Sequence, residues 1–185
     1  MVSSNNFKTG MTIEYEDNIF QVIEFQHVKP GKGAAFVRTR LKNLRTGATI
    51  DHTFKSDEKM AQAMIDKITM QYLYDDGDAL AFMDMETFIQ MDIPKERLVD
   101  EISYLVEGMS VIVIKYMDEL LGVQLADKVT LKVIQTPPGV KGNTAANATK
   151  DAILETKLVV QVPLFINEGD SIIVNTNDGK YNSRA

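Results

Sequence analysis

Short segments that alternate apolar and polar residues, separated by turn-forming residues, fill almost the whole 185-residue chain. In Ile50–Lys55, for example, every second residue is apolar or aromatic and the residues between are polar or charged. This period of two places the two sets of side chains on opposite faces of a β-strand. Stretches such as Asp75–Asp78 and Asn177–Gly179 favour tight turns between strands. The pattern therefore predicts small sheets and barrels rather than a helical bundle.

The first third of the chain predicts one small barrel. Strand patterns cover 11–15, 18–26, 35–41 and 48–55, and the polar segment 56–59 follows them. Several short strands in a segment of about 55 residues favour closure, because closure removes exposed strand edges. We therefore expect a first domain at residues 1–64.

Residues 65–127 predict a second barrel, of the oligonucleotide-binding (OB) type. Strand patterns cover 66–74, 79–83, 86–91, 110–117 and 122–125. Pro94 is expected to begin a short helix through Tyr104, because the apolar residues of this segment are spaced for one helix face. A fragment of a β-sandwich fits the same strand pattern.

Residues 128–185 predict a third all-β domain. Strand patterns cover 129–136, 152–162 and 171–175, with a short strand segment at 180–181, and the Gly-, Asn-, Thr- and Ala-rich stretch 141–149 predicts a loop. The whole chain is therefore expected to be all-β, with three small β-barrel domains.

Basic residues concentrate in one hairpin, although the net charge of the chain is −6. Between Gln26 and Ile50 there is no Asp or Glu, and the cations in this stretch are Lys29, Lys32, Arg38, Arg40, Lys42 and Arg45. Three of them, Arg38, Arg40 and Lys42, share one strand face because they are two residues apart. This face is either an ordinary solvated surface or a phosphate-binding surface, where each cation would release counterions from RNA or DNA.

Lys32 lies at the predicted tip of this hairpin, between two glycines in the sequence Pro30-Gly31-Lys32-Gly33. Glycine offers no side chain for the lysine to pack against, so we expect the ammonium group to point into solvent. Lys32 is then either a solvated loop residue or a group that reaches into another molecule or becomes modified.

No residue pattern indicates an enzyme, a cofactor site or a metal site. The chain has no cysteine, and His27 and His52 lack neighbouring metal-ligand patterns. Gly31–Gly33 is too short for a phosphate-binding loop and precedes a strand rather than a helix. Asp75–Asp78 lacks the remaining ligands of a calcium loop. We therefore expect a protein that is not an enzyme and that holds no cofactor or metal.

The chain shows no targeting or membrane signal. No apolar run approaches the ~20 residues that span a bilayer, and residues 1–6 lack the layout of a signal peptide. The absence of cysteine suits a reducing compartment. We expect a cytoplasmic protein with no membrane partner.

The string PGKGAAFVR at residues 30–38 resembles the tip hairpin of the bacterial translation elongation factor P family. The resemblance continues in order along essentially the whole chain. Its further segments are Lys42–Gly47, Tyr72–Gly77, Thr136–Thr144, Val162–Asp170 and Tyr181–Arg184.

The resemblance implies an SH3/KOW-like barrel followed by two OB-fold-like barrels, in an L-shaped, tRNA-like arrangement. It also implies a monomeric elongation factor that binds the 70S ribosome between the peptidyl- and exit-tRNA sites and relieves stalling at consecutive prolines. The implied partners are the ribosome, peptidyl-tRNA, exit-site mRNA and an enzyme system that modifies a lysine. An elongation-factor-P-like paralogue and a generic ribosome- or RNA-binding protein remain the alternatives.

The resemblance also assigns residues. Lys32 corresponds to the modified residue, which in the family carries a β-lysyl or an aminopentanol group. The implied tRNA- and rRNA-binding residues are Lys29, Pro30, Gly31, Lys32, Gly33, Arg38, Arg40, Lys42, Tyr181 and Arg184. Gly142, Asn143 and Thr144 correspond to a loop near the exit-site mRNA, although many family members have Asp at the position of Asn143.

Overall fold

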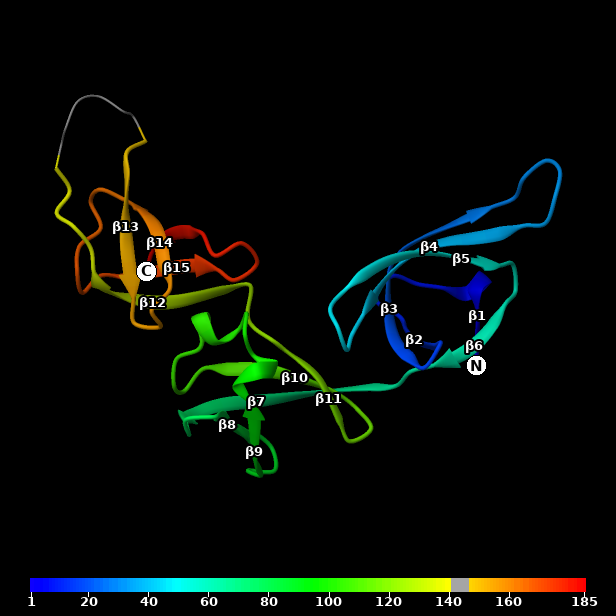
Figure 1. Ribbon diagram of the computed structural model, residues 1–185, viewed down its shortest axis with the longest axis horizontal. Coiled ribbons are helices and arrows are strands. Elements are labelled where there is room, and N and C mark those ends of the chain that lie inside the picture. The colour runs from blue at the N-terminus through cyan, green and yellow to red at the C-terminus, as the bar shows by residue number, and fades with distance from the viewer. Residues whose placement is uncertain (141–146) are drawn as a thin grey trace. The chain divides into compact units, whose positions relative to one another are not determined.

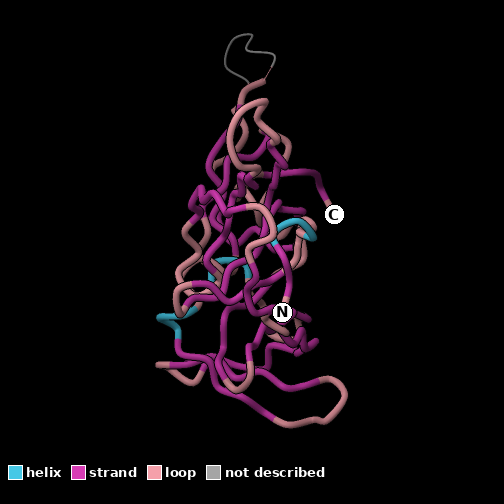
Figure 2. Tube along the Cα trace, turned by 90° about the vertical axis from the view of Figure 1, so that its right-hand side faces the viewer, coloured by secondary structure: helices cyan, strands magenta, loops and turns pink. Residues whose placement is uncertain are grey.

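Strands dominate the computed structural model (Figure 2), and the helices among its described residues are three short 3-10 turns. The structure describes residues 1–140 and 147–185. By contacts within this part of the chain, the protein divides into two compact units. One contains Met1–Lys67 and Val113–Gly122, and the other contains Ile68–Ile112 and Val123–Ala185.

The first six strands form one curled antiparallel sheet in the order β1-β6-β2-β3-β4-β5 (Figure 1). Its members are β1 (Val2–Ser3), β2 (Thr12–Tyr15), β3 (Asn18–Val28), β4 (Phe36–Asn43), β5 (Thr49–Lys55) and β6 (Lys59–Gln62), with the 3-10 turn η1 (Ser4–Asn6) after β1. The four strand patterns at 11–55 are thus confirmed. The sheet does not end with the polar segment at 56–59, because β6 follows it and pairs with both β1 and β2.

The second sheet has the strand order β11-β10-β7-β8-β9. Its strands are β7 (Ile65–Asp75), β8 (Ala79–Asp84), β9 (Gln90–Pro94), β10 (Ser110–Tyr116) and β11 (Glu119–Gln124). The strand predicted at 86–91 was wrong in its first half. The Asp84 carboxylate accepts hydrogen bonds from the backbone N–H groups of Glu86 and Thr87, so a turn forms there and β9 begins only at Gln90.

The helix predicted from Pro94 to Tyr104 was also wrong. The segment instead forms two separate 3-10 turns, η2 (Lys95–Arg97) and η3 (Ile102–Tyr104). The chain leaves the helical region at Leu98, which has φ −124° and ψ 24°. Leu98 is fully buried, as the apolar spacing requires, but the backbone at this residue does not continue the helix.

The third sheet has the strand order β14-β13-β12-β15-β16. Its strands are β12 (Lys128–Gln135), β13 (Thr149–Leu154), β14 (Val159–Pro163), β15 (Ser171–Asn175) and β16 (Tyr181–Arg184). The single strand predicted at 152–162 is two strands, because Lys157 adopts φ +69° and its N–H donates to the Leu154 carbonyl across a tight turn.

The curled sheets confirm the predicted all-β class, and KOW-like and OB-type barrels fit them. The boundaries at 64 and 127 and the L-shaped arrangement stay predictions. The tip of the β10–β11 hairpin, although predicted within the second domain, packs into the first compact unit, where Leu121 lies against Ile19 and Ala63.

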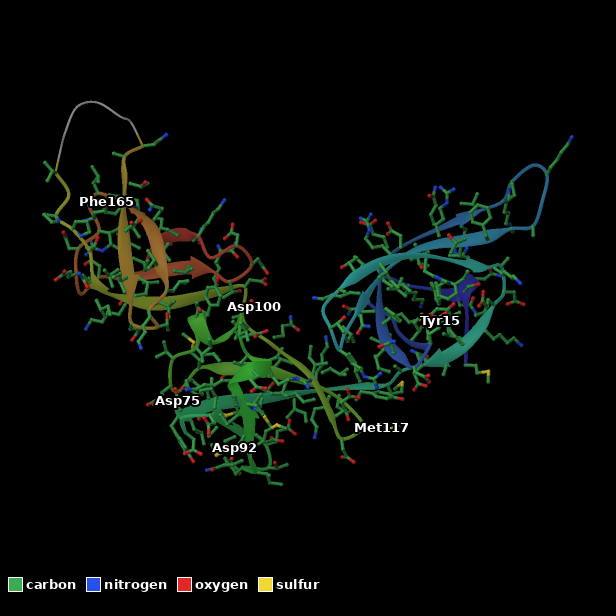
Figure 3. All side chains as sticks on the ribbon, viewed as in Figure 1. Tyr15, Asp75, Asp92, Asp100, Met117 and Phe165 are labelled. Atoms are coloured by element: carbon green, nitrogen blue, oxygen red, sulfur yellow. The ribbon has the colours of Figure 1, made fainter. Side chains whose placement is uncertain are left out.

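Phe54 is the centre of the first core. It is fully buried, and its ring lies 5.4 Å from that of Phe7, 5.1 Å from Tyr15 and 4.5 Å from His52 between centroids. Tyr15 is labelled within this sheet in Figure 3. The predicted alternation in β5 holds only in part, because Ile50, at the same parity as Phe54, is exposed.

We predict that Phe54→Ala lowers the free energy of unfolding of the first unit by about 3–5 kcal/mol, because it leaves a cavity where three rings now pack. Ile50→Ala on the same strand should cost less than about 1 kcal/mol. Urea denaturation of both variants measures the difference. Equal losses would contradict a core centred on Phe54.

Candidate nucleic-acid interface

The β3–β4 hairpin carries most of the sequence-predicted site residues. Its two strands are paired antiparallel from Phe20↔Asn43 to Val28↔Phe36. The loop that joins them projects beyond the rest of its sheet (Figure 1, blue). Long cross-strand pairing therefore holds the loop away from the body of the barrel.

The two faces of β4 are as the sequence predicts. Val37, Thr39 and Leu41 are buried, and their exposed neighbours Arg38, Arg40 and Lys42 lie on the opposite face. The Thr39 hydroxyl donates a 2.8 Å hydrogen bond to the His52 carbonyl, so this buried polar group is satisfied.

Arg40 is neutralised by two acids that the sequence pattern did not reveal. Its Nε donates to Asp51 Oδ1 at 3.0 Å, and its Nη1 lies 3.7 Å from Glu24 Oε2. These acids lie outside the acid-free stretch, but strand pairing aligns Glu24 and Asp51 with Arg40 from either side. The hydrogen bond to Asp51 raises the pKa of the Arg40 guanidinium above its usual value.

Arg38 and Lys42 keep their charge available. The Arg38 guanidinium carbon lies 5.5 Å from the centroid of the Phe36 ring, within cation–π distance, and the residue is exposed. Lys42 lies between the polar residues Gln21 and Thr49 in the sheet. Within residues 1–140 and 147–185, neither cation forms an ion pair.

Lys32 is exposed at the tip, as the sequence predicts. Among the described residues, its side chain has no hydrogen bond or ion pair. Gly33 has φ +110°, a left-handed conformation that glycine adopts without strain. A Cβ at Gly33 would lie 3.8 Å from Pro30 Cγ, whereas one at Gly31 would meet no atom within 4 Å. Lys29 is exposed where the loop leaves β3.

Arg45 is engaged inside the first compact unit. Its guanidinium forms a bidentate pair with Glu119, with both N–O distances 2.9 Å, and also donates to the Asp17 carbonyl. Nearby, the Tyr116 hydroxyl donates to Glu14, and this bond raises the pKa of Tyr116. The pairing of Arg45 with Glu119 spans 74 positions, and no local pattern in the sequence signals it.

Tyr181 and Arg184 lie on β16, in the other unit. Tyr181 is half-buried and packs against the core of the third sheet. Arg184 Nη2 lies 2.9 Å from Asp170 Oδ1. Both residues are therefore held in a paired strand and do not belong to a frayed terminus. Gly142, Asn143 and Thr144 lie outside the described residues.

The next two statements hold for residues 1–140 and 147–185. No group of three or more His, Asp or Glu side chains is placed to hold a metal ion. No helix in 1–140 or 147–185 has the length and apolar character needed to cross a membrane.

Three family sequence models match the chain. They are described as the elongation factor P KOW-like domain, the elongation factor P OB domain and the elongation factor P C-terminal domain, and they match residues 3–60, 65–123 and 129–184. A curated relative from Moorella thermoacetica named elongation factor P is 52% identical over 185 residues, which is 100% of both chains.

Two solved structures have a similar fold. Translation initiation factor 5A from Methanococcus jannaschii aligns with a TM-score of 0.53 at 22% identity, over 68% of this chain and 90% of the other. An initiation factor 5A family protein from Naegleria fowleri aligns with a TM-score of 0.50 at 18% identity, over 67% and 96%.

We predict that Gly33→Ala changes the tip loop and that Gly31→Ala leaves it almost unchanged. Only Gly33 holds a φ that an L-residue rarely adopts. Backbone NMR chemical shifts and φ-dependent couplings of residues 30–34 measure the change. Equal perturbation by both variants would show that the loop is not held in this conformation.

Proposed function

Because the chain belongs to the elongation factor P family of translation elongation factors, we propose that it binds the 70S ribosome between the peptidyl- and exit-tRNA sites. There it promotes peptide-bond formation at consecutive prolines. The observation that carries the proposal is the exposed Lys32 at the tip of a long hairpin, whose side chain has no partner among the residues that the structure describes. The proposed site of action is the cytoplasm, and the proposed acting form is a monomer.

The proposed mechanism is positioning rather than chemistry on a substrate. Proline has a fixed ring and restricts the residue before it, so a polyproline end can hold the peptidyl ester away from the attacking amine. A group that fixes the acceptor end of the tRNA lowers the entropic part of this barrier, and good positioning is worth up to roughly 7–11 kcal/mol in ideal cases. We propose that Lys32 is this group and that the protein is not itself an enzyme.

Modification of Lys32 would extend its reach. The ammonium has no partner among the described residues, so a modifying enzyme can approach it without breaking any contact. Pro30 restricts the loop backbone, which reduces the ordering cost when the tip enters the ribosome.

The surrounding cations are proposed to contact tRNA and rRNA phosphates, with Arg38, Lys42 and Lys29 the main contributors. Arg40 contributes less, because Asp51 and Glu24 already neutralise it. Tyr181 and Arg184 are proposed to contact RNA from the other unit, and residues 142–144 to lie near exit-site mRNA.

We predict that Lys32→Ala selectively slows synthesis of a Pro-Pro-Pro reporter and leaves a proline-free reporter unchanged, because only the stalled reaction needs the acceptor end held in place. Lys8→Ala is the matched control, since Lys8 is another exposed lysine of the same unit. In vitro translation with purified components measures both rates. Equal effects of Lys32→Ala on the two reporters would indicate a generic RNA-binding protein.

The in vitro translation assay is repeated with the unaltered protein purified from its native cells. The intact mass of that protein reports the group attached to Lys32. An unmodified mass together with full activity would contradict the proposed modification.

The salt dependence of ribosome binding separates the cations. The slope of log K against log salt concentration is negative. We predict that Lys42→Ala reduces its magnitude by about 0.7–0.9, the value for one lost phosphate contact. Arg40→Ala should lower it by clearly less, because it removes a cation already paired with Asp51. Equal slopes for the two variants would contradict the division into free and paired cations.

A further inference from the structure

The chain contains one pair of consecutive prolines, Pro137 and Pro138, and Gly139 follows the pair. Each of the remaining prolines stands between two residues of other types; they are Pro30, Pro94 and Pro163. The pair comes shortly after β12 and before β13 to β16, the strands drawn orange to red in Figure 1. A ribosome that translates this chain therefore joins consecutive prolines at a single place, before most of the third sheet has been made.

Hydrogen bonds to the backbone hold this segment in the folded protein. The Pro137 carbonyl accepts a 2.7 Å bond from Lys150 Nζ, and the Pro138 carbonyl accepts a 3.0 Å bond from the Val140 N–H. Every type of residue supplies such a carbonyl, and both prolines are exposed. Neither bond depends on a proline ring, so Pro138→Ala is compatible with the fold.

Gly139, in contrast, is required by packing. A Cβ at this position would lie 2.3 Å from the carbonyl oxygen of Leu164 and 3.1 Å from its carbonyl carbon. These are backbone atoms, which cannot turn aside as the end of a flexible side chain can, so only glycine fits here. An experiment on this segment should therefore change a proline and keep Gly139.

Two successive reactions on the ribosome involve the proline pair. In the first, the secondary amine of Pro138 attacks the ester carbonyl of the chain that ends at Pro137. The new C–N bond forms, the ester C–O bond breaks, and the amine proton goes to the ribose oxygen that leaves. In the second, the amine of Gly139 attacks the chain that ends in both prolines. A fixed proline ring stands at the reacting end each time, so both reactions need the acceptor end held in place.

We propose that the protein acts on its own nascent chain, so that its synthesis depends on copies that are already active. The inference rests on the proposed function, in which Lys32 positions the tRNA acceptor end. A cell with little active protein completes new chains slowly, because β13 to β16 can be made only after Pro137 and Pro138 have been joined. The supply of new protein thus follows the amount of protein whose Lys32 is already functional.

In vitro translation of the chain's own coding sequence, with purified components that lack this protein, tests the inference. Full-length protein from native cells is added or left out, and the reaction is sampled for complete chain and for peptidyl-tRNA arrested at residues 137–138. Addition should raise the early yield of complete chain at least threefold and remove the arrested species. The Lys32→Ala protein, added at the same concentration, should do neither.

Two altered templates assign the effect to the proline pair. The Pro138→Ala template should be completed at the same rate with and without the added protein, because it has no adjacent prolines. The Pro94→Ala template is the matched control, since it removes an isolated proline and should depend on the added protein as the unaltered template does.

The outcomes separate this inference from the proposed function. If a Pro-Pro-Pro reporter needs the protein but the unaltered template does not, the inference is overturned and the proposed function stands. Dependence that persists in the Pro138→Ala template also overturns the inference. If neither the reporter nor the unaltered template needs the protein, both are overturned.

Discussion

The antiparallel pairing of β4 between β3 and β5 is the constraint on which the candidate site depends. Because side chains alternate along a strand, this register decides that Val37 and Leu41 enter the core and that Arg38 and Lys42 face solvent. A slip of one residue would exchange the two sets. The same pairing extends to Val28↔Phe36 and so holds the tip loop away from the barrel. The register of β4 against β3 and β5 therefore determines both which side chains pack in the core and which cations are exposed.

That register also limits the charge of the site. It aligns Glu24 and Asp51 with Arg40, so a stretch of sequence without acids becomes a surface with acids on either side of one cation. Exposed ion pairs of this kind contribute little to stability. Their main consequence is that Arg40 is paired, whereas Arg38 and Lys42 form no ion pair within 1–140 and 147–185. The available positive charge is therefore concentrated at these two positions of the strand.

The sequence predicted those features that depend on local periodicity. Strands β2 to β5 of the first sheet, the two faces of β4 and the exposed tip at Lys32 were found because each rests on alternation or on a glycine turn, whereas β1 and β6 were not predicted. The sequence prediction failed where the same local pattern is compatible with two different secondary structures. The apolar spacing around Leu98 suits a helix, but the backbone leaves the helical region at that residue. A three-residue polar turn at 155–157 was also not recognised. Pairs such as Arg45 with Glu119 arise only from the tertiary fold.

The β10–β11 hairpin tip makes the first unit discontinuous along the chain, because Val113–Gly122 joins Met1–Lys67. Arg45, Glu14 and the apolar residues around Ile19 find their partners in that hairpin. Recombination that joined residues 1–64 to another protein would therefore separate the barrel that carries Lys32 from part of its own packing. A functional transfer would also have to include Val113–Gly122, about fifty positions downstream. The Lys32 hairpin and the barrel of residues 65–127 are thus expected to be inherited together.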